Sequence, residues 1–164
     1  MWILGWVLAS AQAAGFGSSV GITPRGGPGA FYPSFDVHAD PIVLQIHALE
    51  FLDGLTNDQV YFGANLYFDA GRRTIGRSRF EAVVQPGVSV DIVAEPGTLV
   101  VLGEARVGME IPSADGGFGI YVVPALGVGV GEPDVLPGIG DDGPLIVGGA
   151  LQISAWLGNP RRRE

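Results

Sequence analysis

The sequence predicts an all-β fold, an antiparallel up-and-down β-barrel of about eight strands that crosses a membrane. Two observations lead to this prediction. Apolar residues alternate with small or polar ones through most of the chain, as in FEAVVQPGVSVDIV at residues 80–93, where every even position is apolar. Glycine and proline, 27 and 12 of the 164 residues, separate the alternating stretches and predict short turns. No stretch shows a convincing helical period.

The alternating stretches predict eight strands. They fall at residues 15–24, 33–39, 42–52, 59–69, 79–94, 98–111, 117–130 and 144–157. Turns centred on residues 95–98, 112–117 and 70–78 predict that Val88 pairs with Ala105, Gly108 with Tyr121, and Tyr61 with Gly87. Pro86 and Pro124 fall inside predicted strands, where proline is expected at a bulge because it has no N–H to donate.

The first residues, MWILGWVLASAQAAG, predict an export signal at 1–14. An apolar run from Trp2 to Ala9 is followed by small residues of the kind found at cleavage sites. The run is much shorter than the ~20 residues that a membrane-spanning helix needs. No basic residue precedes it, so a buried N-terminal helix is the alternative. A single barrel domain at 15–158 and a basic tail at 159–164 complete the predicted organisation.

Charge and cysteine content exclude several function classes. The nine basic residues are all arginine and the net charge is −8, so no basic surface for nucleic acid is expected. The absence of cysteine excludes disulfides, thiolate catalysis and cysteine metal sites. Charged residues make up 16% of the chain, below the roughly 25–35% of well-behaved soluble surfaces.

The alternation leaves two possibilities for the apolar face. If it forms a core, the protein is a soluble barrel or sandwich. Strands 117–130 and 144–157 would then be exposed to water without a charged residue on either face. If the apolar face meets lipid, small and polar residues fill the narrow interior of an eight-stranded barrel. The second possibility is favoured, and it places Val84, Val88 and Ile92 in lipid. Four aromatic residues are then expected in a girdle near the end with the termini: Phe16, Phe68, Phe80 and Phe118.

A cysteine-free, exported chain with eight alternating strands resembles the small eight-stranded outer-membrane β-barrels of the OmpA/OmpX type. The resemblance covers nearly all of residues 15–158 and rests on pattern. It implies a location in the outer membrane of a Gram-negative bacterium and a structural, adhesive or partner-binding role without catalysis. Those barrels commonly end on an aromatic residue, whereas this chain continues past Trp156 and Leu157 into GNPRRRE.

The candidate site is a polar network inside the barrel. Its expected members are Glu81, Gln85, Ser89, Glu104, Arg106 and His47. Charges in such an interior must pair, so the two glutamates and the arginine predict a packed ionic plug.

Neither a metal centre nor a catalytic triad is predicted. His38 and His47 face inward on the expected register with Asp36 nearby, but their spacing does not demand a metal. A Ser89–His47–Glu104 triad would require strands to meet across the lumen. We therefore expect no enzyme activity, no cofactor and no metal.

The expected partners are membrane lipid and a protein or cell-wall polymer. The acidic loop 131–144 and the arginine-rich turn 70–78 are the segments expected to contact them. Two other functions stay open: a soluble periplasmic or secreted barrel or sandwich that binds an apolar ligand, and a membrane-embedded barrel enzyme.

Overall fold

The computed structural model describes residues 15–23, 30–48, 61–93, 97–130 and 145–158. The predicted signal peptide, the loop 131–144 and the C-terminal tail lie outside these residues. The strands are β1 (Gly15–Thr23), β2 (Ala30–Ala39), β3 (Ile42–Ala48), β4 (Tyr61–Phe68), β5 (Gly71–Thr74), β6 (Glu81–Val93), β7 (Thr98–Ser113), β8 (Gly116–Val130) and β9 (Leu145–Leu157).

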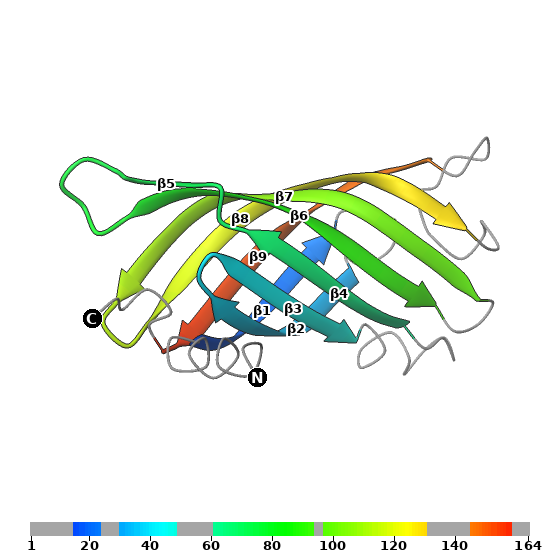
Figure 1. Ribbon diagram of the computed structural model, residues 1–164, viewed down its shortest axis with the longest axis horizontal. Coiled ribbons are helices and arrows are strands. Elements are labelled where there is room, and N and C mark those ends of the chain that lie inside the picture. Colours follow the sequence, from blue (N-terminus) through cyan, green and yellow to red (C-terminus); the bar gives the residue numbers. More distant parts are fainter. Residues whose placement is uncertain (1–14, 24–29, 49–60, 94–96, 131–144, 159–164) are drawn as a thin grey trace, which may run out of the picture.

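Eight of these strands form a closed antiparallel barrel. The sheet order is β4-β3-β2-β1-β9-β8-β7-β6-β5, and an additional pairing of β4 with β6 closes the ring (Figure 1). Pairing of β1 with β9 joins the two ends of the described chain, so neighbours in sequence are neighbours in the barrel. The predicted up-and-down barrel is confirmed. Among the described residues, no helix has the length and hydropathy needed to cross a membrane.

The ninth strand, β5, was not expected, and it explains how Pro86 is accommodated. Both β4 and β5 pair with β6, Tyr67 with Gly87 and Gly71 with Val84. Four residue steps separate Tyr67 from Gly71, whereas three separate Gly87 from Val84, so one extra residue forms a β-bulge. This bulge lies in the strand opposite Pro86 and not in β6. Proline has no N–H to donate, so it fits where the ladder is already interrupted.

The bulge predicted at Pro124 is wrong. Glu104 pairs with Ala125 and Val107 pairs with Val122, and both pairs belong to one unbroken register. The residues between them are not paired, so the ladder has a gap beside Pro124 and no inserted residue.

Two of the three predicted neighbour pairs are wrong by an even number of residues. Val88 pairs with Gly103 instead of Ala105. The last described pair of this hairpin is Val93 with Thr98, so the turn is centred one residue earlier than predicted. A shift of two residues returns every side chain to the same face. The predicted face of each residue, inward or outward, is therefore correct despite the error in register.

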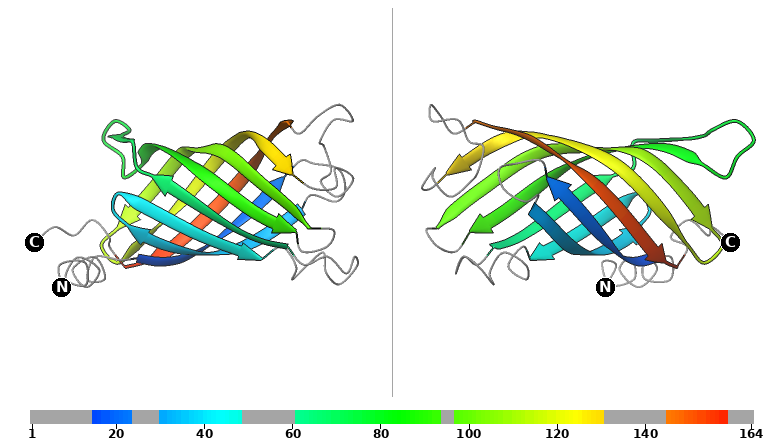
Figure 2. Two further views of the ribbon diagram at one scale, coloured as in Figure 1. Left: turned by 45° about the vertical axis from the view of Figure 1, so that its right-hand side comes forward. Right: turned by 180° about the vertical axis from the view of Figure 1, so that it is seen from behind.

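The third predicted pair, Gly108 with Tyr121, is confirmed. Tyr61 was expected beside Gly87, but Tyr67 occupies that place. The reason is β5, which continues the pairing with β6 past the predicted turn at 70–78 (Figure 2). The tip of this hairpin therefore lies further along the chain than predicted.

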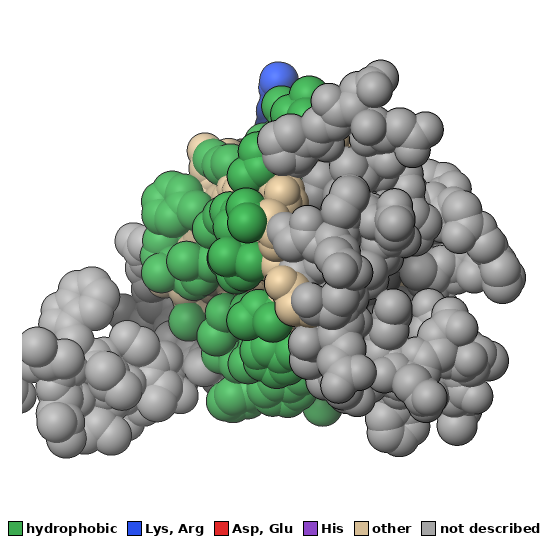
Figure 3. Space-filling view, turned by 90° about the vertical axis from the view of Figure 1, so that its right-hand side faces the viewer, with side chains coloured by type: hydrophobic (Ala, Val, Ile, Leu, Met, Phe, Trp, Pro, Cys, Tyr) green, Lys and Arg blue, Asp and Glu red, His purple; other side chains and the backbone are tan. Residues whose placement is uncertain are grey.

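Polar and apolar side chains are sorted in the opposite way from a soluble barrel. The even positions of β6 point outward, and Val84, Val88, Val90 and Ile92 are 40–49% exposed. On the outward face of β1–β4 and β6–β9, no described residue is charged. Hydrophobic side chains make up most of the described surface in Figure 3. The inward face holds most of the buried polar residues.

Candidate functional site

The interior of the barrel is filled by polar and aromatic side chains. Alternation along each strand directs them inward, and most are less than 10% exposed. The largest fully buried side chains are those of Arg106, Tyr67, Tyr121, Gln45, Gln85, Gln152 and Glu110. Two groups of contacts can be distinguished, one around Asp36 and one around Arg106.

The Asp36 cluster joins β1, β2, β3 and β9. Its centre is the fully buried carboxylate of Asp36, which accepts hydrogen bonds from Ser34 Oγ at 2.9 Å, Gln45 Nε2 at 3.0 Å and Ser154 Oγ at 2.9 Å. Ser19 Oγ also donates to this carboxylate. A carboxylate that receives several donors is well satisfied without water. The cluster thereby ties together strands that lie on both sides of the junction between β1 and β9.

His38 lies beside this cluster. Its Nε2 is 3.9 Å from Asp36 Oδ2, and its ring stacks on that of Trp156 with centroids 4.8 Å apart. The described residues contain no group of three or more histidine, aspartate or glutamate side chains arranged to hold a metal. His38 is therefore placed as a packed interior residue, in contact with an aromatic ring.

The Arg106 cluster joins β4, β7 and β8. Arg106 is fully buried, and its guanidinium carbon lies 3.9 Å from the centre of the Tyr121 ring and 5.1 Å from that of Tyr67. Tyr121 Oη donates to Glu110 at 2.8 Å, and Tyr67 Oη donates to Glu104 at 2.6 Å. Each ring thus contacts the cation with its face and a carboxylate with its hydroxyl.

Cation–π contact is the main interaction that the structure shows for the Arg106 guanidinium. Its three nitrogens have no hydrogen-bond partner among the described residues, although they are buried. Gln85, its direct neighbour across β6 and β7, likewise has both amide atoms buried without a partner in the described part of the chain. The negative potential of the two ring faces and of nearby carboxylates must therefore offset the desolvation of the cation.

A third group of charges lies where β5 meets the barrel. Arg72 forms ion pairs with Asp69 and with Glu110, and its Nη1 is 3.5 Å from Glu81 Oε2. Glu81, expected in a cluster with Arg106, forms an ion pair with Arg72. Glu110 contacts both Arg72 and Tyr121, so it connects this group to the Arg106 cluster.

The other expected network members are placed as follows. Gln85 and Ser89 are buried on the inner face, and Ser89 Oγ donates to Asp91 at 2.9 Å. Glu104 is half-buried and accepts a hydrogen bond from Tyr67. The backbone of His47 pairs with Ser34 and Gly63, but its side chain lies outside the described residues.

Four further members of the interior network were not predicted from the sequence: Tyr67, Tyr121, Asp36 and Glu110. A partial signal existed in the glycines, because wide rings need space on neighbouring strands. A Cβ placed on Gly87 would overlap Tyr67, and one placed on Gly117 would overlap the ring of Trp156. The glycines thus mark where interior rings lie, although they do not say what those rings contact.

Comparison with known proteins identifies no relative: no family model, no curated protein and no solved structure matches this chain. Membership of the OmpA/OmpX type therefore stays a prediction based on pattern.

Proposed function

We propose that the chain is an integral β-barrel protein of a bacterial outer membrane, with a structural, adhesive or partner-binding role and no catalysis. The observation behind this proposal is the inverted sorting of side chains, with an uncharged apolar outer face and a buried polar interior. A closed barrel is one of the two structures that satisfy all backbone groups in lipid.

The apolar outer face extends around the whole barrel. Soluble monomers rarely expose a contiguous apolar patch above roughly 300–600 Å². Here every strand of the barrel contributes a large exposed side chain, between 39% and 60% accessible: Phe16, Phe35, Ile46, Leu66, Val88, Val107, Val122 and Leu151. Contact with lipid would remove this surface from water.

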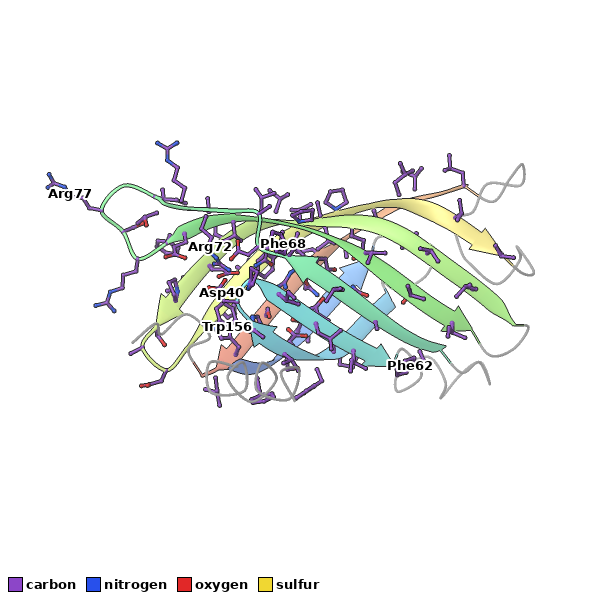
Figure 4. The ribbon with its side chains drawn as sticks, viewed as in Figure 1. Asp40, Phe62, Phe68, Arg72, Arg77 and Trp156 are labelled. Atoms are coloured by element: carbon purple, nitrogen blue, oxygen red, sulfur yellow. The ribbon has the colours of Figure 1, made fainter. Side chains whose placement is uncertain are left out.

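The lengths and ends of the strands also support a membrane location. Strands β1, β2 and β6–β9 contain 9–16 residues, whereas a spanning strand needs about 9–11. Phe62 and Phe68 lie near opposite ends of β4 and are 50% and 53% exposed (Figure 4). Phe16 and Phe118 are exposed near strand ends as well, and interfacial aromatic girdles have this placement. Phe80, also expected in the girdle, lies instead at the tip of the hairpin 71–84, past the barrel end.

The alternative of a soluble barrel that binds an apolar ligand is less well supported. Such a barrel needs an apolar lumen and an outer face suited to water. This lumen holds Arg106 and Asp36 at its most buried positions, and Val84 and Ile92 point outward.

The hydrogen bonding of the interior favours a structural over a catalytic role. Ser19 and Ser154 are 1% and 0% exposed, and the hydroxyl of each donates to Asp36. Those of Tyr67 and Tyr121 donate to carboxylates. A nucleophile needs access to substrate, and these buried hydroxyls instead hold strands together.

Cell fractionation and gel migration test the proposal. We expect the expressed full chain in the outer-membrane fraction, with a faster-migrating band in unboiled samples because the closed barrel resists detergent. Recovery in the soluble fraction, together with identical migration before and after boiling, would refute it. N-terminal sequencing of the mature protein tests the export signal, and an intact Met1 would rule out cleavage.

A further inference from the structure

A hairpin formed by β5 and the start of β6, residues 71–84, extends past the barrel end (Figures 1 and 2). Its tip is closed by hydrogen bonds: Ile75 N–H donates to Phe80 O at 2.9 Å, and Ser78 Oγ donates to Ile75 O at 2.6 Å. Gly76 supplies the left-handed conformation, with φ of 61°, that the tight turn requires. The hairpin, which we call the arginine hairpin, is therefore an ordered projection.

The arginine hairpin carries three exposed arginines, Arg73, Arg77 and Arg79. Among the described residues, the ion pairs made from this hairpin to carboxylates all involve Arg72 or Glu81, which face the barrel. Figure 4 shows the difference in direction, with Arg77 at the tip pointing away from the barrel. This concentration of positive charge stands out in a chain whose net charge is −8.

The outward face of the arginine hairpin also carries apolar side chains. Ile75 and Phe80 form the closing pair of the tip and are 44% and 43% exposed. Along β6, Phe80 is in line with the outward residues Ala82 and Val84, so the apolar outer face of the barrel continues onto the hairpin. Arg73 pairs with Ala82 on the same face. The guanidinium of Arg73 therefore adjoins the apolar outer face directly.

We propose that the arginine hairpin binds the phosphates of anionic phospholipids at the membrane surface. This inference rests on the proposed membrane location. Arginine forms bidentate, charge-assisted hydrogen bonds with phosphate, and each basic residue near an anionic membrane strengthens binding about five-fold. A soluble acidic partner would also match Arg77 and Arg79. Lipid is favoured because Ile75 and Phe80 prolong the apolar outer face that would meet acyl chains. A site for a lipid head group combines such apolar side chains with basic ones.

The absence of native cysteine allows a probe to be placed beside the hairpin. Ala82→Cys, on the outward face next to Arg73, would carry a fluorescent label in the full chain. The labelled protein is reconstituted into phosphatidylcholine vesicles that contain 20 mol%, that is about one lipid in five, phosphatidylglycerol. In one set the phosphatidylglycerol has brominated acyl chains, and in the other an equal fraction of the phosphatidylcholine is brominated. The ratio of the two quenching efficiencies reports enrichment of the anionic lipid.

We expect phosphatidylglycerol to quench the label at least two-fold more strongly than phosphatidylcholine. The triple substitution Arg73→Gln, Arg77→Gln and Arg79→Gln should return the ratio to about one, and high salt should reduce it in the native hairpin. Arg161→Gln, Arg162→Gln and Arg163→Gln remove the same charge from the tail and serve as the matched control. The ratio in that variant should be unchanged.

The outcomes separate the two proposals. If neither brominated lipid quenches the label, the outer face does not meet lipid and the membrane location is wrong. A ratio of one with efficient quenching leaves the barrel in the membrane but overturns head-group binding. Head-group binding is also overturned if the raised ratio persists in the hairpin variant, or if the ratio falls by the same amount in the tail variant. Arginine-dependent retention on a heparin column, together with a ratio of one, would assign the hairpin to a soluble acidic partner.

Discussion

The guanidinium of Arg106 lies against the face of Tyr121, with its carbon 3.9 Å from the centre of the ring. The hydroxyl of the same tyrosine donates to Glu110 at 2.8 Å. Tyr67 repeats this arrangement with Glu104. The barrel therefore holds a buried cation over the faces of two aromatic rings whose hydroxyls donate to carboxylates.

Replacement of Arg106 tests this arrangement. Arg106→Met removes the cation but leaves Glu104 and Glu110, so we expect a loss of about 3–5 kcal/mol in the free energy of unfolding, the usual cost of breaking a buried charge pair. Urea unfolding in detergent micelles, followed by fluorescence, measures it. Arg106→Lys keeps the charge without the planar group and should lose less. An unfolding free energy unchanged in Arg106→Met would contradict the ionic interior.

The contribution of the ring can be separated from that of the hydroxyl. Tyr121→Phe keeps the ring face on Arg106 and removes the hydrogen bond to Glu110, so a loss of about 1–3 kcal/mol in unfolding free energy is expected. Tyr121→Leu also removes the cation–π contact and should be less stable by roughly a further 2 kcal/mol. The same unfolding measurement applies. Equal losses in the two variants would show that the ring face contributes nothing.

The side on which each residue lies was predictable from the sequence. A period of two determines the face, and errors of two residues in register, as at Val88, leave it unchanged. Gln85, Ser89 and Arg106 accordingly lie inward where alternation places them.

The contacts inside the barrel were not predictable in the same way. They depend on which strands lie close across the lumen, and therefore on hairpin tips and strand tilt. The strand β5 shifted the tip after β4, placed Tyr67 beside Gly87 and brought Arg72 to Glu110. Local residue pattern does not contain this information, because loop length and bulges set it.

The carboxylate of Asp36 provides a test of the second interior cluster. Asp36→Asn leaves one acceptor oxygen and turns an amide donor toward the donors Ser19, Ser34, Gln45 and Ser154, so at least one buried group loses its partner. We expect a loss of about 1–3 kcal/mol for each such group. Ser34→Ala, which removes a single donor, should be milder. Urea unfolding compares them, and an Asp36→Asn protein as stable as Ser34→Ala would show that the cluster does not depend on the carboxylate.

Glycines that face interior rings should tolerate no side chain. Gly87→Ala would place a methyl group into the carbonyl oxygen of Leu66 and the ring of Tyr67, and we expect destabilisation by about 1–3 kcal/mol from overpacking. Gly103→Ala is the matched control, because its Cβ would meet only Leu126 O at 3.6 Å on the outer face. Thermal unfolding midpoints of the two variants test this. If both midpoints shift equally, the loss of stability comes from replacing any strand glycine and not from the space that the Tyr67 ring requires.

A charge on the outer face distinguishes lipid from water around the barrel. Val122 points outward from the middle of β8 and is 60% exposed. In a membrane, Val122→Arg places a guanidinium in acyl chains and should reduce the folding free energy in vesicles by about 2–4 kcal/mol near the midplane. Val122→Ala removes the same apolar contacts without adding charge, so the difference between the two variants isolates the charge. In water, an arginine at so exposed a position is nearly neutral. Equal folding free energies for Val122→Arg and Val122→Ala would therefore mean that this face meets water, and the barrel would have to be assigned to a soluble compartment.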